Sequence, residues 1–100
     1  MATFQEIING NKPVLVDFFA EWCGPCKTMS PILEGLKKSV GDDAIILKVD
    51  VDKNSTAANA FQVRSVPTLI LFKQGKPIWR QSGVVPAAQL SSLISYHLAN

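Results

Sequence analysis

Residues 14–27 read Val-Leu-Val-Asp-Phe-Phe-Ala-Glu-Trp-Cys-Gly-Pro-Cys-Lys. The first six are rich in β-branched and aromatic side chains and almost continuously apolar, which is typical of a strand covered on both faces. After the two cysteines, apolar residues recur at helical spacing from Met29 to Val40, and Gly41 provides a stop. The sequence therefore predicts a central strand that leads through a pair of cysteines into a helix.

Outside this segment, helical and strand patterns alternate along the chain. The expected elements are a capped helix ending near residue 10, a strand over 44–51, a short helix ending at 61, strands over 68–72 and 77–82, and a last helix opened by Pro86. Strands joined through helices run parallel, whereas the tight turn at 74–75 makes the last two antiparallel. We therefore expect an α/β fold with a mixed sheet of about four strands and helices on both faces.

The composition bounds the class of protein. With 100 residues, 47% of them hydrophobic, the chain has enough apolar material for one core, so residues 1–100 are expected to form one domain. The net charge is +2 and the basic residues are scattered, which predicts neither nucleic acid nor membrane as a partner. The two cysteines form no network of bridges, and residues 1–11 do not resemble a secretory signal. These features favour a reducing compartment, the cytoplasm.

Cys23 and Cys26 are expected to form a redox switch. Their spacing places both on one face of the first helical turn, close enough for the sulfurs to bond. On the chain-entropy account, closing so short a loop stabilises a fold much less than a long-range bridge does. A use in opening and closing is therefore favoured over a structural one.

The helix assigns the two cysteines unequal roles. Cys23 lies at the N-terminus, where unpaired N–H groups and the positive end of the dipole favour a thiolate, and Trp22 beside it indicates an exposed rim. We expect Cys23 to attack a substrate disulfide, and Cys26, one turn inward and more buried, to resolve the mixed disulfide. Gly24 permits close approach of a substrate backbone, and Pro25 stiffens the loop.

Two other interpretations of the cysteine pair are weaker. The pair could be half of a zinc site, but zinc needs four ligands and His97 is the only other Cys or His in the chain. A single chain therefore could not complete a tetrahedron of Cys and His, and two chains would have to share the site. Two inert buried thiols fit poorly with the Trp-Cys-Gly-Pro-Cys-Lys context between a strand and a helix. We therefore expect no metal at this site.

Residues 18–27 closely resemble the active-site segment of the thioredoxin family. The resemblance continues through further segments along most of the chain, namely residues 14–17, Pro31, residues 48–52, 66–68 and 72–75, and Gly83. It implies a thioredoxin fold that lacks the usual first edge strand, since the chain begins directly at the first helix. It also implies reduction of protein disulfides by Cys23 and Cys26, recharged with NADPH electrons through thioredoxin reductase, and no bound cofactor, because the dithiol itself carries the electrons.

Asp17 and Lys48 are candidate supporting residues. Asp17 alternates with Leu15 and Phe19 on an otherwise apolar strand, so its carboxylate is expected inside, beneath the cysteine helix, where burial would raise its pKa. The resemblance gives it the role of a base that deprotonates Cys26 through water. The alternative is an aspartate in solvent at the end of the strand. Lys48, similarly placed in the next strand, is expected either to pair with Asp17 or to extend along the surface.

The resemblance also implies a substrate-binding surface. Pro67 would be cis, although most X-Pro bonds are trans, and would leave the backbone of Val66 free to pair with an extended substrate segment. The apolar contacts would come from Trp22, Val66, Gly83 and Val84, beside Gly24 and Pro25. The chain departs from the family pattern at Phe19, where many members have a second tryptophan, and at Val84, where a smaller residue is common and the groove would be reshaped.

The sequence thus predicts a small monomeric thiol-disulfide oxidoreductase that reduces other proteins. One alternative is a redox-controlled binding module, in which the surface around Trp22 docks a partner and turnover is secondary. Another is a disulfide oxidant or isomerase. Gly24-Pro25 argues against the oxidant, because strong oxidants of this fold usually carry a histidine between the cysteines that stabilises the reduced form.

Overall fold

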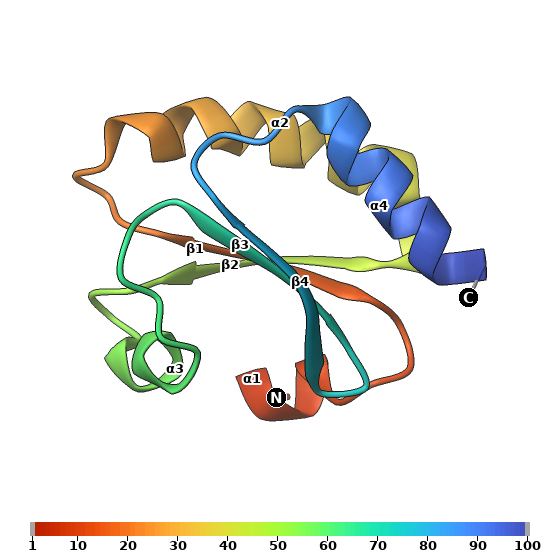
Figure 1. Ribbon diagram of the computed structural model, residues 1–100, viewed down its shortest axis with the longest axis horizontal. Coiled ribbons are helices and arrows are strands. Elements are labelled where there is room, and N and C mark those ends of the chain that lie inside the picture. The colour runs from red at the N-terminus through yellow and green to blue at the C-terminus, as the bar shows by residue number, and fades with distance from the viewer. Residues whose placement is uncertain (1, 100) are drawn as a thin grey trace.

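In the computed structural model, residues 2–99 are described, and they contain a single mixed sheet (Figure 1). Its strands are β1 (Val14–Phe19), β2 (Ile45–Asp50), β3 (Thr68–Lys73) and β4 (Lys76–Ser82), in the spatial order β2-β1-β3-β4. β1 runs parallel to β2 and antiparallel to β3, which pairs antiparallel with β4. The predicted four-strand mixed sheet is confirmed, with β2 and β4 at its edges.

The helices cover both faces of this sheet. They are α1 (Phe4–Ile8), α2 (Gly24–Val40), α3 (Ser55–Ala60) and α4 (Ala87–Ala99), and a short 3-10 turn, η1 (Gly41–Asp43), follows α2. In Figure 1, α2 and α4 lie above the sheet and α1 and α3 below it. The capping box that opens α1 is present, since Thr3 and Glu6 exchange two hydrogen bonds of 3.1 Å. Within residues 2–99, no helix is long and apolar enough to cross a membrane.

Alternation along β1 divides its side chains between two cores. Leu15 joins the core beneath α2 and α4, whereas Val14, Val16 and Phe18 join the core on the side of α1 and α3. Asp17 follows the parity of Leu15 and therefore faces α2. The core contacts of α4 end at Ile94, and Leu98, one turn further on, is 45% exposed.

The β3–β4 turn provides a test of the packing between the sheet and α1. Gly75 has a φ of +82°, its N–H donates to the carbonyl of Ile8 at 2.8 Å, and a Cβ at this position would run into the side chain of Asn9. We expect Gly75→Ala to lower the free energy of unfolding by about 1–2 kcal/mol, measured by urea denaturation of the oxidised protein. The matched control is Gly35→Ala, at an exposed site in α2 with open space around it, which should raise stability by about 0.5–1 kcal/mol. A Gly75→Ala protein as stable as wild type would contradict the argument.

Candidate active site

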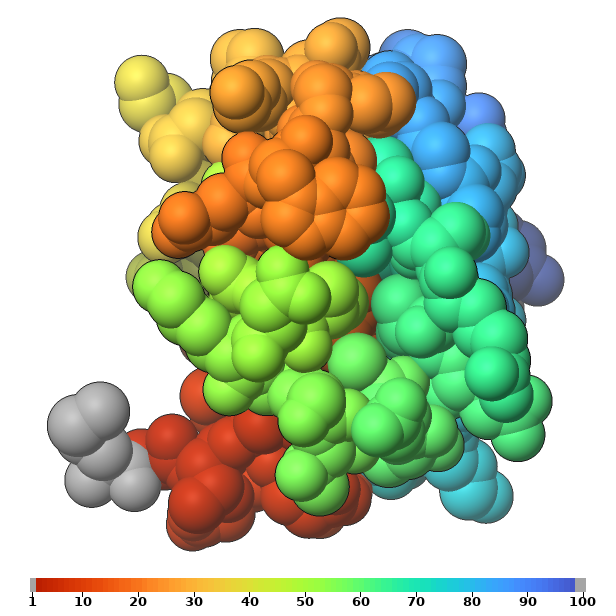
Figure 2. Space-filling model, turned by 90° about the vertical axis from the view of Figure 1, so that its left-hand side faces the viewer, coloured from red at the N-terminus to blue at the C-terminus, as the bar shows by residue number. Residues whose placement is uncertain are grey.

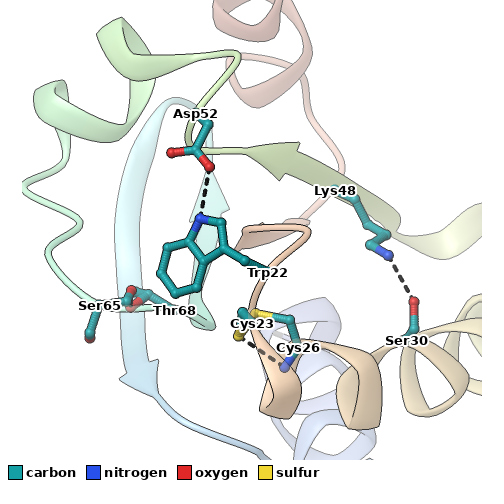
Figure 3. The surroundings of a disulfide bond; sticks show 8 residues. All are labelled: Trp22, Cys23, Cys26, Ser30, Lys48, Asp52, Ser65 and Thr68. Atoms are coloured by element: carbon teal, nitrogen blue, oxygen red, sulfur yellow. Dashed lines mark hydrogen bonds between the residues drawn. A yellow bond between two sulfur atoms is a disulfide. The ribbon is translucent and has the colours of Figure 1, made fainter.

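The two cysteines lie where β1 passes into α2 (Figure 3). Cys23 is the N-cap residue of α2, with extended backbone angles, and the backbone N–H of Cys26 donates to its Sγ at 3.1 Å. The two sulfurs are joined in a disulfide, with 5.3 Å between the Cα atoms. Pro25 occupies the first turn, where a missing N–H costs no helical hydrogen bond and a fixed φ suits the helix.

The burial of the cysteines corrects one detail of the sequence analysis. Cys26 was expected to be the more buried of the two, but Cys23 is 4% and Cys26 5% exposed. Both cysteines form a small cluster with Ala20, against which the partly buried side chains of Phe19, Val51 and Val66 pack. Solvent exposure therefore does not distinguish the two cysteines.

Trp22 forms the exposed rim that the sequence indicated. Its side chain is 72% exposed, and its Nε1 donates to Oδ2 of Asp52 at 3.0 Å, which orients the indole beside the disulfide. No sequence pattern indicated a role for Asp52. The available signal was its position just after β2, because the carboxyl ends of parallel strands are where sites in open α/β sheets form.

Asp17 is buried beneath α2, as predicted. It is 0% exposed, and within residues 2–99 neither of its carboxylate oxygens has a hydrogen-bond partner. Burial raises the pKa of Asp17 to about 6, and the positive charge of Lys48 opposes part of this rise. The alternative of an aspartate in solvent at the end of the strand is wrong.

Lys48 is opposite Asp17 in the register of β1 and β2. Its Nζ donates to Oγ of Ser30 at 2.8 Å and lies 4.6 Å from the centroid of the Phe19 ring. It forms no ion pair with Asp17 within 4 Å in the described part of the chain. Of the two expectations for this residue, the structure favours an extended surface lysine over direct pairing.

The loop before β3 forms the wall that faces the cysteines. The Val66–Pro67 peptide is cis, as the family resemblance implied, and the N–H of Gly83 donates to the carbonyl of Pro67 at 2.8 Å. Val66 is half-buried and Val84 is 42% exposed. Figure 2 shows the orange segment that carries the cysteines beside the yellow-green segment after β2 and the green segment before β3.

A small apolar pocket lies at this junction. Its volume is about 130 Å³, and its lining residues come from the rim, from the end of β2 and from the loop before β3: Trp22, Val51, Val63, Arg64, Ser65 and Val66. The structure therefore brings Trp22 and Val66 together as predicted. Gly83 joins them through its hydrogen bond to Pro67.

The residues described, 2–99, contain no group of three or more His, Cys, Asp or Glu side chains that could hold a metal ion.

Comparison with known proteins decides the family. The family model described as Thioredoxin matches residues 1–96. The chain belongs to the thioredoxin family. It is 50% identical over 90 residues to a thioredoxin-like protein of Synechocystis, covering 89% of this chain and 86% of that one. It is 45% identical over 94 residues to the thioredoxin of Alicyclobacillus acidocaldarius, covering 94% and 90%. A solved thioredoxin variant from Halobacterium salinarum superposes with a TM-score of 0.85 at 38% identity, covering 94% of this chain and 81% of that chain.

Family membership and the bonded Cys23–Cys26 pair establish the chemistry. The chain is a thiol-disulfide oxidoreductase with the activity of a protein-disulfide reductase. Thioredoxins in general act on disulfide substrates and are reduced by thioredoxin reductase. The alternatives, a redox-controlled binding module in which turnover is secondary and a disulfide oxidant or isomerase, are not favoured, because the family model and the similar proteins are thioredoxins.

Proposed function

We propose that Cys23 is the nucleophile and Cys26 the resolving thiol in the reduction of protein disulfides. The observation that carries this assignment is the position of Cys23 as N-cap of α2, with the Cys26 N–H directed at its sulfur. A thiolate at that position accepts a charge-assisted hydrogen bond and lies at the positive end of the helix dipole, so its formation is favoured. Cys26, inside the first turn, lacks this advantage.

The reaction balances with two thiols and two electrons. The Cys23 thiolate attacks one sulfur of the substrate disulfide, forming a mixed disulfide and releasing the other substrate sulfur as a thiolate. Cys26 then attacks Sγ of Cys23, which closes the Cys23–Cys26 disulfide and releases the second substrate thiolate. The substrate gains two electrons and the chain loses two.

Asp17 is the proposed base for Cys26. Its carboxylate is buried under the helix that carries the thiol, and a pKa near 6 suits a group that must be ionised near neutrality and still accept a proton. A water molecule is the proposed relay. Lys48 supports the reaction through its charge, which favours the ionised form of Asp17.

The proposed docking surface for the substrate surrounds the disulfide. The exposed indole of Trp22 and the exposed side chain of Val84 supply apolar contact. Within residues 2–99 the backbone N–H and carbonyl of Val66 make no hydrogen bond, so an extended substrate strand can pair with them beside cis Pro67. Gly24 permits close approach of the substrate backbone, Pro25 stiffens the loop, and Gly83 completes the contact surface.

The proposed electron donor is an NADPH-linked thioredoxin reductase, and the proposed compartment is the cytoplasm. Net reduction of substrates needs a continuous supply of electrons, and a reducing compartment provides it. The proposed functional unit is a monomer, because each chain carries both thiols and the base.

A coupled assay tests this function. With a bacterial thioredoxin reductase and NADPH, the chain is expected to reduce insulin through many turnovers, followed by NADPH oxidation at 340 nm. Omission of either component should stop the reaction. Insulin that stays oxidised although the reductase reduces the Cys23–Cys26 pair would favour a redox-controlled binding module instead.

A further inference from the structure

A second opening leads toward the buried side of the active site. It is a pocket of about 220 Å³ on the α2 side of β1 and β2, and the residues that line it are Phe19, Ala20, Glu21, Cys26, Lys27, Ser30 and Lys48. It reaches the resolving cysteine from the side away from Trp22. In Figure 3, Lys48 and Ser30 face each other on that side of the disulfide.

The ammonium of Lys48 is held at this pocket by two groups. It donates to Oγ of Ser30 on α2 at 2.8 Å and lies over the ring of Phe19 on β1, 4.6 Å from its centroid. A lysine ammonium on a flexible four-carbon stem otherwise moves freely. Both groups therefore restrain a charge that would not keep one position by itself.

The ammonium is not paired with the buried carboxylate of Asp17. Lys48 and Asp17 are register neighbours on β2 and β1, so their side chains emerge on the same face of the sheet. In the described part of the chain they nevertheless form no ion pair within 4 Å, and the Asp17 oxygens have no hydrogen-bond partner. A buried carboxylate without a partner is a strong acceptor for any cation that can reach it.

We infer that Ser30 is a positioning residue, whose hydroxyl holds the Lys48 ammonium at the pocket and so prevents it from pairing directly with Asp17. Removing the hydroxyl removes the acceptor that the ammonium contacts, and the ammonium then moves toward the carboxylate. An opposite charge at closer range favours ionised Asp17 and lowers its pKa. Ser30 thereby keeps Asp17 a better base than a directly paired carboxylate would be.

The other charged and titratable groups around Asp17 do not replace Lys48 in this role. Those that line the pocket are Glu21, before α2, and Lys27, on α2, whereas Cys26 is bonded to Cys23 and does not titrate in the oxidised protein. On β3, the register neighbour of Asp17 is the apolar Leu69. From α4, the core on this face receives the apolar Leu90 and Ile94. Lys48 is the charge that acts on Asp17.

Titration of the Asp17 carboxyl carbon by NMR in the oxidised protein tests the inference. We expect Ser30→Ala to move the midpoint to lower pH by about one unit, whereas Ser30→Thr, which keeps the hydroxyl, matches wild type. Ser39→Ala, an exposed serine on the same helix, is the matched control and should have no effect. In a Lys48→Met background, Ser30→Ala should also have no effect. An unchanged or raised midpoint in Ser30→Ala, or a shift that persists without Lys48, would overturn the inference.

The effect of Ser30 on catalysis rests on the proposed role of Asp17 as a base, and a second measurement tests it. If Asp17 is the base, the acid limb of the pH profile of kcat/KM for insulin reduction shifts to lower pH in Ser30→Ala, by as much as the NMR midpoint does. If the midpoint moves while the limb stays, and Asp17→Asn also leaves the limb unchanged, Ser30 still positions Lys48 and the base role of Asp17 is wrong.

Discussion

Cys23→Ser is expected to bring insulin reduction down to the uncatalysed rate, a loss of about 10³-fold or more. A serine hydroxyl at the N-cap of α2 keeps the hydrogen bond from Cys26, so the fold is expected to persist. It does not ionise near neutrality, however, and forms no bond to sulfur that can be exchanged. The coupled NADPH assay measures the rate, and far-UV circular dichroism confirms that the variant is folded.

Cys26→Ser separates attack from resolution. Cys23 can still attack the substrate disulfide, but no second thiol is present to displace the product, so the mixed disulfide accumulates. With oxidised insulin as substrate, we expect a mixed disulfide between Cys23 and an insulin chain to appear on non-reducing gels and to vanish with dithiothreitol. The double variant Cys23→Ser/Cys26→Ser is the control and should form no adduct. If Cys23→Ser traps the substrate and Cys26→Ser does not, the two roles are reversed.

Patterns of nearby residues predicted most of the fold. The alternation on β1 placed Asp17 on the α2 face, and the structure finds it fully buried there. Thr3 and Glu6 predicted the start of α1, because the capping box depends on residues only three apart. Strand β1 has the predicted bounds, since its apolar run ends where the charged Glu21 and the exposed rim begin.

Contacts between segments that are distant in the sequence could not be predicted from local patterns. The hydrogen bond between Lys48 and Ser30 joins β2 to α2, and no local spacing indicates it. Similarly, the equal burial of Cys23 and Cys26 depends on Val51 and Val66, which approach the cysteines from other parts of the chain. The cis Val66–Pro67 bond was expected only through the family resemblance, because the ordinary preference of an X-Pro bond is trans.

The carboxyl group of Asp17 is expected to make the stability of the oxidised protein fall as pH rises. Its pKa is raised by burial from 3.8 to about 6 in the folded state. The folded protein therefore holds this proton over a range where the unfolded chain has lost it. The contribution favours folding fully below about pH 4 and is lost as pH rises through about 6. The size of the loss is about 3 kcal/mol, from a pKa difference of about two units.

Asp17→Asn isolates this effect. The amide does not titrate, so any cost of burying it is the same at every pH and cancels in the comparison. We expect urea denaturation of the oxidised proteins to show the variant gaining about 3 kcal/mol relative to wild type between pH 4 and pH 8. Parallel stability curves for the two proteins would mean that Asp17 ionises equally in the folded and unfolded states. Burial without a partner would then not govern this carboxylate, and its proposed use as a base tuned to neutral pH would lose its physical ground.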